Sequence, residues 1–123
     1  MLCLDLLSMK GEALKGHLDA LLLAVVAEGP VHGYAVVERL RARSGGHFDL
    51  PEGTVYPALH RLEADGLLRS RWTVVRGRKR RQYELSDRGR SALDDRSAEW
   101  RRFAAAVEHV LAARVPASSE ATA

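Results

Sequence analysis

The sequence has 123 residues, of which 46% are hydrophobic and 28% are charged. This composition is typical of one soluble globular domain, and the chain is too short for two full-sized domains. No apolar run reaches the roughly 18 residues of a membrane-spanning helix, and segment 1–7 contains Asp5 and lacks the basic start of a signal peptide. The single cysteine, Cys3, allows neither an internal disulfide nor a multi-cysteine zinc site. We therefore expect a cytoplasmic protein that does not enter the membrane.

The positive charge is concentrated in one part of the chain. The net charge is only +3, with 19 Lys and Arg against 16 Asp and Glu. Segment 61–90 holds ten basic and four acidic residues, so its formal charge is +6 and the rest of the chain sums to −3. The densest run is RGRKRR at 76–81. A basic run is either a solvated surface or a polyanion site; its position between two strand-like segments favours the polyanion site.

Three short helices are predicted in the first half of the chain. The first runs from Leu14 to Ala27, where leucines and valines repeat with a 3.6-residue period, and the Glu28-Gly29-Pro30 turn ends it. The second runs from about Tyr34 to Arg43. After an extended connector, the third runs from about Glu52 to Asp65, and it tolerates Pro57 only because that residue lies near its first turn.

The second half of the chain changes from this period to a period of two. Residues 68–74 alternate between apolar and polar, as do Tyr83 and Leu85, which predicts a β-hairpin with its tip at Arg76 to Arg80. Ser86 is the expected N-cap of a long helix over 87–114. The small, polar residues 115–123 predict a disordered tail.

These elements predict a mainly α (α+β) fold, namely a winged helix-turn-helix with a two-stranded wing and a long C-terminal dimerisation helix. The expected division is an N-terminal extension over 1–13, a DNA-binding domain over 14–86, the dimerisation helix over 87–114 and the tail over 115–123.

Three segments carry a resemblance to a known family. They read GTVYPALHRLEADGLL at 53–68, EGPVHGY at 28–34 and RKRRQYELSDRG at 78–89. In combination they resemble the PadR family of bacterial transcriptional regulators, over about residues 15–113. The N-terminal residues 1–8 and the alanine-rich end of the long helix depart from the family pattern. The resemblance implies a DNA-binding regulator that forms a two-fold dimer.

The third helix has the face that a recognition helix needs. At about 100° per residue, Val55, Leu59 and Leu62 centre its apolar side. The opposite side combines small groups with hydrogen-bonding groups that fit the major groove. The predicted contacts are Thr54, Pro57, His60 and Arg61, with Ala58 permitting close approach. Arg61 is expected to pair with a guanine edge or a phosphate.

Two tyrosines and the basic run extend this predicted interface. Tyr56 and Tyr34 either pack their rings in the core or direct their hydroxyls to a phosphate, and the family resemblance favours the phosphate. The wing residues are expected to bind phosphates with little sequence preference. They are Arg76, Arg78, Lys79 and Arg80, whereas Arg81 and Gln82 either point inwards or flank the groove.

Apolar residues along the long helix predict a dimer seam. Their spacing of seven is that of coiled-coil a and d positions, although a helix folded back on its own domain is the alternative. The predicted seam consists of Leu93, Trp100, Phe103, Ala104, Val107 and Leu111. Because some PadR relatives bind planar aromatic compounds between subunits, Trp100 is either a simple interface residue or part of an effector slot.

No other chemistry is predicted. The five histidines show no metal-binding spacing, and no enzyme motif or cofactor loop is present in the sequence, so we expect no metal, no cofactor and no catalysis. The predicted function is a dimeric regulator of double-stranded DNA with a palindromic operator, acting as a repressor that responds to a small molecule. The alternatives are an RNA-binding or a protein-interaction winged helix. RNA binding is disfavoured because most of the seven aromatic residues are assigned to core stripes.

Overall fold

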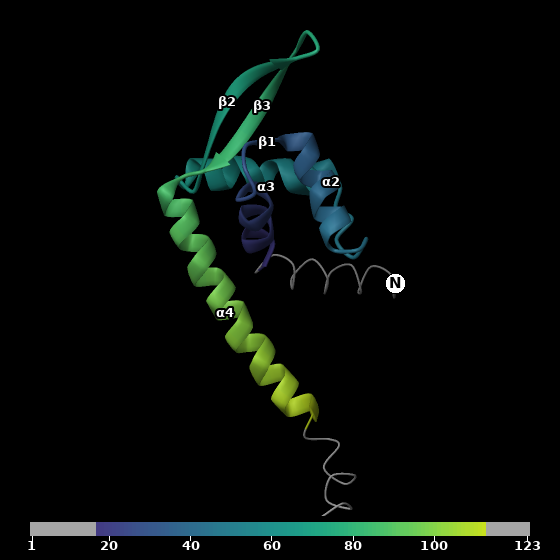
Figure 1. The fold of residues 1–123 in the computed structure, drawn as a ribbon, viewed down its shortest axis with the longest axis vertical. Coiled ribbons are helices and arrows are strands. Elements are labelled where there is room, and N and C mark those ends of the chain that lie inside the picture. The colour runs from purple at the N-terminus through teal and green to yellow at the C-terminus, as the bar shows by residue number, and fades with distance from the viewer. Residues whose placement is uncertain (1–16, 113–123) are drawn as a thin grey trace, which may run out of the picture. The chain divides into compact units, whose positions relative to one another are not determined.

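The structure, a computed structural model, describes residues 17–112 (Figure 1). Its first helix is described over 17–26. The elements that follow are β1 (Val31–His32), α2 (Gly33–Arg43), α3 (Glu52–Ala64), β2 (Leu68–Val75), β3 (Arg78–Leu85) and α4 (Asp87–Ala112). The mainly helical α+β fold with a hairpin and a long last helix is thus confirmed. The predicted N-terminal extension, the start of the first helix, the end of the last one and the predicted tail lie outside the described residues.

The three strands form one antiparallel sheet in the order β1-β3-β2. Within the hairpin, Leu68 is paired with Leu85 at the base and Val75 with Arg78 near the tip. The short strand β1 was not predicted from the sequence. It adds to the other edge of β3 by pairing Val31 with Tyr83 and His32 with Gln82, so the base of the wing is tied to the start of α2.

The hairpin tip is tighter than the sequence analysis expected. A five-residue tip over 76–80 was wrong, because only Arg76 and Gly77 lie between the strands. Both have positive φ, 51° and 77°, as in the primed two-residue turns whose twist matches that of the flanking strands. Arg78, Lys79 and Arg80 are therefore strand residues, and their side chains alternate between the two faces of the wing.

The core forms where the first three helices meet the base of the sheet. The largest fully buried side chains are Leu22, Leu23, Val26, Val36, Val55, Leu59, Leu62 and Leu68. On α3 the predicted apolar side is buried, and Ala58 is buried with it. The expectation that Ala58 lies at the DNA-facing side was therefore wrong, because the apolar arc of α3 is wide enough to include it.

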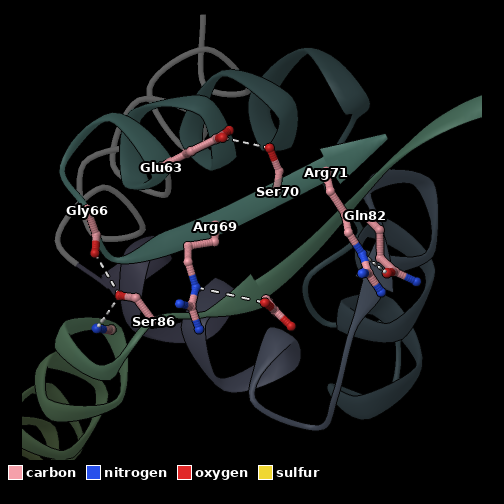
Figure 2. Close-up of polar contacts among 9 residues, drawn as sticks. Glu63, Gly66, Arg69, Ser70, Arg71, Gln82 and Ser86 are labelled. Carbon is pink, nitrogen blue, oxygen red and sulfur yellow. Dashed lines mark hydrogen bonds and ion pairs between the residues drawn. The ribbon is translucent and has the colours of Figure 1, made fainter. Parts of the chain in front are cut away.

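The start of α4 packs directly on the chain that leaves α3. As predicted, Ser86 caps the helix: its Oγ accepts from the Gly89 amide at 3.0 Å and donates to the Gly66 carbonyl at 2.6 Å (Figure 2). Gly89 is buried, and a Cβ at this position would lie 2.0 Å from the Leu67 carbonyl oxygen. This approach leaves room for glycine alone.

By its contacts the chain divides between Leu93 and Asp94 into two units. The first unit contains the first helix, α2, α3, the sheet and the start of α4; the second contains the rest of α4. None of the helices within 17–112 is long and apolar enough to cross a membrane.

Candidate nucleic-acid interface

The side of α3 opposite the core is exposed over its whole length. Thr54, Pro57, His60, Arg61 and Ala64 all lie on it and are exposed. The backbone of α3 begins on the Pro51 carbonyl, which accepts from the amides of Thr54 and Val55 at 3.0 and 3.1 Å. The structure thus places all the predicted recognition residues except Tyr56 on one solvent-facing surface.

Arg61 is not free on this surface. Its guanidinium forms an ion pair with Asp19, which lies on the first helix and is less exposed than Arg61. Sequence reasoning missed Asp19, although an acidic residue within an apolar helix was a signal for such a partner. The pair ties the first helix to α3, so a contact between Arg61 and DNA competes with it or uses the remaining N–H groups.

Tyr56 is half-buried at the junction of α3 with α2. Its ring lies against Gly33, where a Cβ would be 3.3 Å from Tyr56 Cε1. Burial, and then the negative charge of Glu52, raises the pKa of Tyr56 above its usual value. The hydroxyl is therefore protonated at neutral pH, and it donates to the Glu52 carboxylate.

Tyr34, at the start of α2, lies in a stack with wing residues. Its ring is stacked on His32 with 5.8 Å between centroids, and the Arg80 guanidinium carbon lies 4.7 Å from its centre. His32 Nε2 is 2.8 Å from Thr73 Oγ1, which donates to the Arg80 carbonyl at 3.2 Å. The stack places the charge of Arg80 beside α2, and the sequence analysis did not predict His32 or Thr73 here.

Five further wing cations fall into two groups. Arg69 pairs with Glu84 at 3.8 Å, and Arg71 donates to Gln82 at 3.3 Å (Figure 2). In contrast, three cations nearer the tip are exposed, and their side chains form no hydrogen bond or ion pair with any residue in 17–112. These are Arg76, Arg78 and Lys79.

The wing also exposes an indole. Trp72 on β2 is 61% exposed, and Val74 on the same face is exposed as well. The assignment of most aromatic residues to core stripes was wrong: Tyr34, Trp72, Trp100 and Phe103 are all exposed. The alternation of apolar and polar residues shows that the hairpin has two different faces. Because the hairpin extends beyond the core, its apolar face need not be covered by the rest of the domain.

Along α4, the predicted seam residues differ in their surroundings. Leu93 is half-buried and packs against the domain's own core. Farther along, the apolar residues of one face are exposed, except for Ala104, which is half-buried. The exposed members are Trp100, Phe103, Val107, Val110 and Leu111. Trp100 and Phe103 lie 5.8 Å apart between ring centroids.

Within 17–112, no group of three or more His, Cys, Asp or Glu side chains is placed to hold a metal ion.

Comparison with known proteins assigns the family. The model described as the transcriptional regulator PadR-like family matches residues 22–95. The chain belongs to this family. PadR-like proteins are transcriptional regulators and not enzymes, and the match spans the described helix-turn-helix, the wing and the start of α4.

Individual relatives agree with this assignment. The transcriptional regulator Rv3488 of Mycobacterium tuberculosis is 49% identical over 73 residues, which cover 58% of this chain and 65% of that protein, just under two thirds of its length. The structure of a PadR family transcriptional regulator from Eggerthella lenta matches with a TM-score of 0.74 at 31% identity, and the match covers 90% of this chain and 97% of that one. Bacillus subtilis PadR in complex with operator DNA shares the fold, with a TM-score of 0.59 at 24% identity over 63% of this chain and 45% of that one.

Proposed function

We propose that this PadR-like protein is a homodimeric repressor that binds a palindromic operator in double-stranded DNA and responds to a small molecule. The observation that carries the DNA-binding part is the juxtaposition, within one unit, of an exposed helix face and a wing with unpaired cations. The exposed face of α3 carries hydrogen-bonding groups, and the wing tip carries Arg76, Arg78 and Lys79 without partners among the described residues.

The face of α3 and the wing make different kinds of DNA contact because they carry different chemical groups. The major groove of B-DNA accommodates an α-helix, and base edges are distinguished there by hydrogen bonds and methyl contacts. Thr54, His60 and Arg61 supply the polar groups on α3, and Pro57 lets the backbone approach closely. Exposed cations on a hairpin bind phosphates regardless of sequence, so the wing supplies affinity and salt dependence.

The stack at the start of α2 supplies a second contact with the DNA backbone. The Tyr34 hydroxyl and the Arg80 guanidinium are donors. The Tyr56 hydroxyl becomes a third donor when a phosphate replaces Glu52 as its acceptor. Donors of this kind suit phosphate oxygens, which position a protein on the duplex without reading its sequence.

Dimerisation is supported by the exposed apolar face of α4. A helix of 26 residues is about 39 Å long, and an exposed stripe with Phe103, Val110 and Leu111 is unfavourable in water. A second copy of the same helix covers this stripe by matching apolar residues with apolar residues. Two domains related by a two-fold axis then meet a palindromic site.

The proposed small-molecule response involves the same seam. Trp100 offers a large aromatic surface, and Ala104 lies one helical turn away on the same side. Two symmetry-related indoles beside small side chains suit a planar aromatic ligand. A ligand that binds one arrangement of the α4 pair better than the other shifts the dimer between them, and with it the spacing of the two α3 helices.

The test is selection of duplexes from a random-sequence DNA pool by the full chain, followed by binding measurements against RNA of equal length. We expect one enriched palindromic sequence and weaker binding to RNA. Equal or tighter binding to RNA would favour the RNA-binding alternative, which the exposure of Tyr34 and Trp72 keeps relevant. Absence of any nucleic-acid binding would favour a protein-interaction module.

A further inference from the structure

We propose that Glu63, Ser70 and Arg81 are positioning residues for DNA recognition, because together they hold the wing against α3. This inference rests on the proposed function, since a fixed arrangement of the two elements matters only if both contact DNA. The three residues come from α3, β2 and β3, and none of them lies on the exposed face of α3 or at the wing tip.

Their side chains form a closed set of contacts. Ser70 Oγ donates to Glu63 Oε2 at 2.6 Å, a contact visible between α3 and β2 in Figure 2. Arg81 Nε donates to the same Ser70 Oγ at 2.9 Å, and Arg81 Nη2 lies 3.4 Å from the same Glu63 oxygen. The hydroxyl thus donates to α3 while accepting from β3, and the arginine spans both partners.

Trp72 covers this arrangement on the wing. It is directly opposite Arg81 in the hairpin register, and the Arg81 guanidinium carbon lies 5.1 Å from the centre of its ring. A guanidinium stacked on an indole gains a cation–π attraction, which helps to hold the Arg81 side chain in place. This contact gives the exposed indole a role that does not require stacking on a base.

Arg81 therefore differs from its neighbours in the same basic run. Arg78 and Lys79 are exposed without partners in 17–112, whereas the Arg81 side chain is 38% exposed and engages Glu63, Ser70 and Trp72. The charge of Arg81 is compensated within the protein by Glu63, so it contributes little to counterion release on DNA.

The contacts extend from Ser70, near the base of the wing, to Arg81, midway along it, so a small tilt there moves the tip. Three strand residues separate Arg81 from the turn, which begins about 13 Å away. A tilt of about 10° would move the tip by roughly 2 Å, enough to break a hydrogen bond. Correct placement of the tip cations while α3 occupies the major groove therefore depends on the contacts among Glu63, Ser70 and Arg81.

The test uses the full chain, the duplex that it selects from a random pool, and a random-sequence duplex. Arg81→Lys keeps the charge but loses the fork that reaches both Ser70 and Glu63. We expect it to lower affinity for the selected duplex about tenfold and to leave affinity for the random duplex unchanged. The matched control is Arg69→Lys, which alters an ion pair on the other face of the wing and should leave both affinities unchanged.

Exchanging the charges of Glu63 and Arg81 distinguishes loss of their mutual interaction from general loss of structure. Glu63→Arg combined with Arg81→Glu should recover part of the selectivity that either single change removes, with thermal unfolding measured on each variant to establish that it is folded. If Arg81→Lys fails to fold, the same comparison is made with Ser70→Ala, which removes only the bridging hydroxyl.

Two results would overturn the inference. One is unchanged selectivity in Arg81→Lys and Ser70→Ala. The other is a flatter salt dependence on both duplexes in Arg81→Met, by about one unit as for loss of a phosphate contact. Failure of the wild-type chain to select any duplex would instead contradict the proposed function.

Discussion

Gly89 shows how one residue determines whether α4 can attach to the domain. Its missing side chain lets the first turn of α4 rest on the Leu67 carbonyl, while Ser86 caps the helix and bonds to Gly66. The hydroxyl and the glycine, three residues apart, thus secure the same turn, one by polar contacts and the other by close approach.

Gly89→Ala should therefore destabilise the protein. A methyl group placed 2.0 Å from a backbone oxygen forces the turn to move, and we expect the free energy of unfolding to fall by about 1–3 kcal/mol. Urea unfolding at a fixed protein concentration measures this loss. The control is Gly53→Ala in α3, where a Cβ meets nothing within 4 Å and helix propensity predicts a gain of about 0.5–1 kcal/mol. Equal stability of the two variants would contradict this account of the α4 attachment.

In the two-residue turn of the wing, Arg76 adopts a positive φ of 51°. Asparagine and glycine are the residues that tolerate this region best. An arginine in this conformation costs conformational free energy, but it keeps a cation at the tip.

Arg76→Asn is expected to separate these two effects. Stability should stay unchanged or rise by a few tenths of a kcal/mol, while the salt dependence of DNA binding should become flatter because one cation is lost. Chemical denaturation and salt titrations of the same variant check both parts. Gly77→Ala is the counterpart that keeps every charge: with a φ of 77° at this position, it should lower stability by about 1 kcal/mol. A stabilised Gly77→Ala would contradict the turn geometry.

Substitutions in the wing and in α3 are expected to change DNA affinity in different ways. Arg78→Ala with Lys79→Ala removes two exposed cations. Affinity should fall on selected and random duplexes alike, with the log–log salt slope flattened by roughly one to two units.

Arg61→Ala should cost about 1–3 kcal/mol on the selected duplex and little on the random one if Arg61 contacts a base. Titrations at several salt concentrations distinguish the two patterns, and equal losses on both duplexes would make Arg61 a phosphate contact.

The ion pair between Arg61 and Asp19 supplies a control for this comparison. Asp19→Asn keeps the shape of the side chain but releases the charge of Arg61. If the pair restrains Arg61, the neutral variant should bind random duplexes more tightly than the wild type does.

Periodicity predicted the elements well because each has a strong local pattern. The apolar stripe of α3 and the cap at Ser86 lay where expected, since both depend on residues within a few positions of one another. The five-residue tip was wrong because an arginine with positive φ at position 76 has no signature in its residue type. Strand β1 was missed because two residues carry no periodicity, and its pairing with Tyr83 depends on the distant β3.

The site was harder to predict than the fold. Exposed polar residues on α3 could be identified from one helix, but their partners come from elsewhere in the chain. Asp19 reaches Arg61 from the first helix, and Glu63 reaches Arg81 across β2. Residue type indicates that a carboxylate can form an ion pair, but tertiary packing determines which cation lies beside it. The same limit applies to Leu93, which the heptad spacing assigned to a seam and the domain's own core partly covers.

For the whole molecule, the central expectation is self-association through α4. Trp100→Glu places a charge in the exposed apolar face, and burying it against a second copy is unfavourable. We expect a monomer with much weaker operator binding, because the two recognition helices then bind independently. Sedimentation velocity measures the first effect and a DNA titration the second.

The matched control is Ala105→Glu, which adds the same charge at an exposed position on the opposite side of α4. It should remain dimeric. A dimeric Trp100→Glu variant would show that the seam lies elsewhere and would remove the support for an effector slot at Trp100.

The register of β1 has a consequence for the order of folding. Val31 and Tyr83 are neighbours in the sheet but 52 positions apart in the chain, whereas the hairpin pairs residues on either side of a two-residue turn. Closing a long loop costs more entropy than closing a short one, and hairpins form within microseconds. The wing can therefore assemble early as a local structure, and the third strand joins only when the N-terminal helices have collapsed onto α3. In this order of assembly, the cations lie on a formed hairpin before that hairpin pairs with the start of α2.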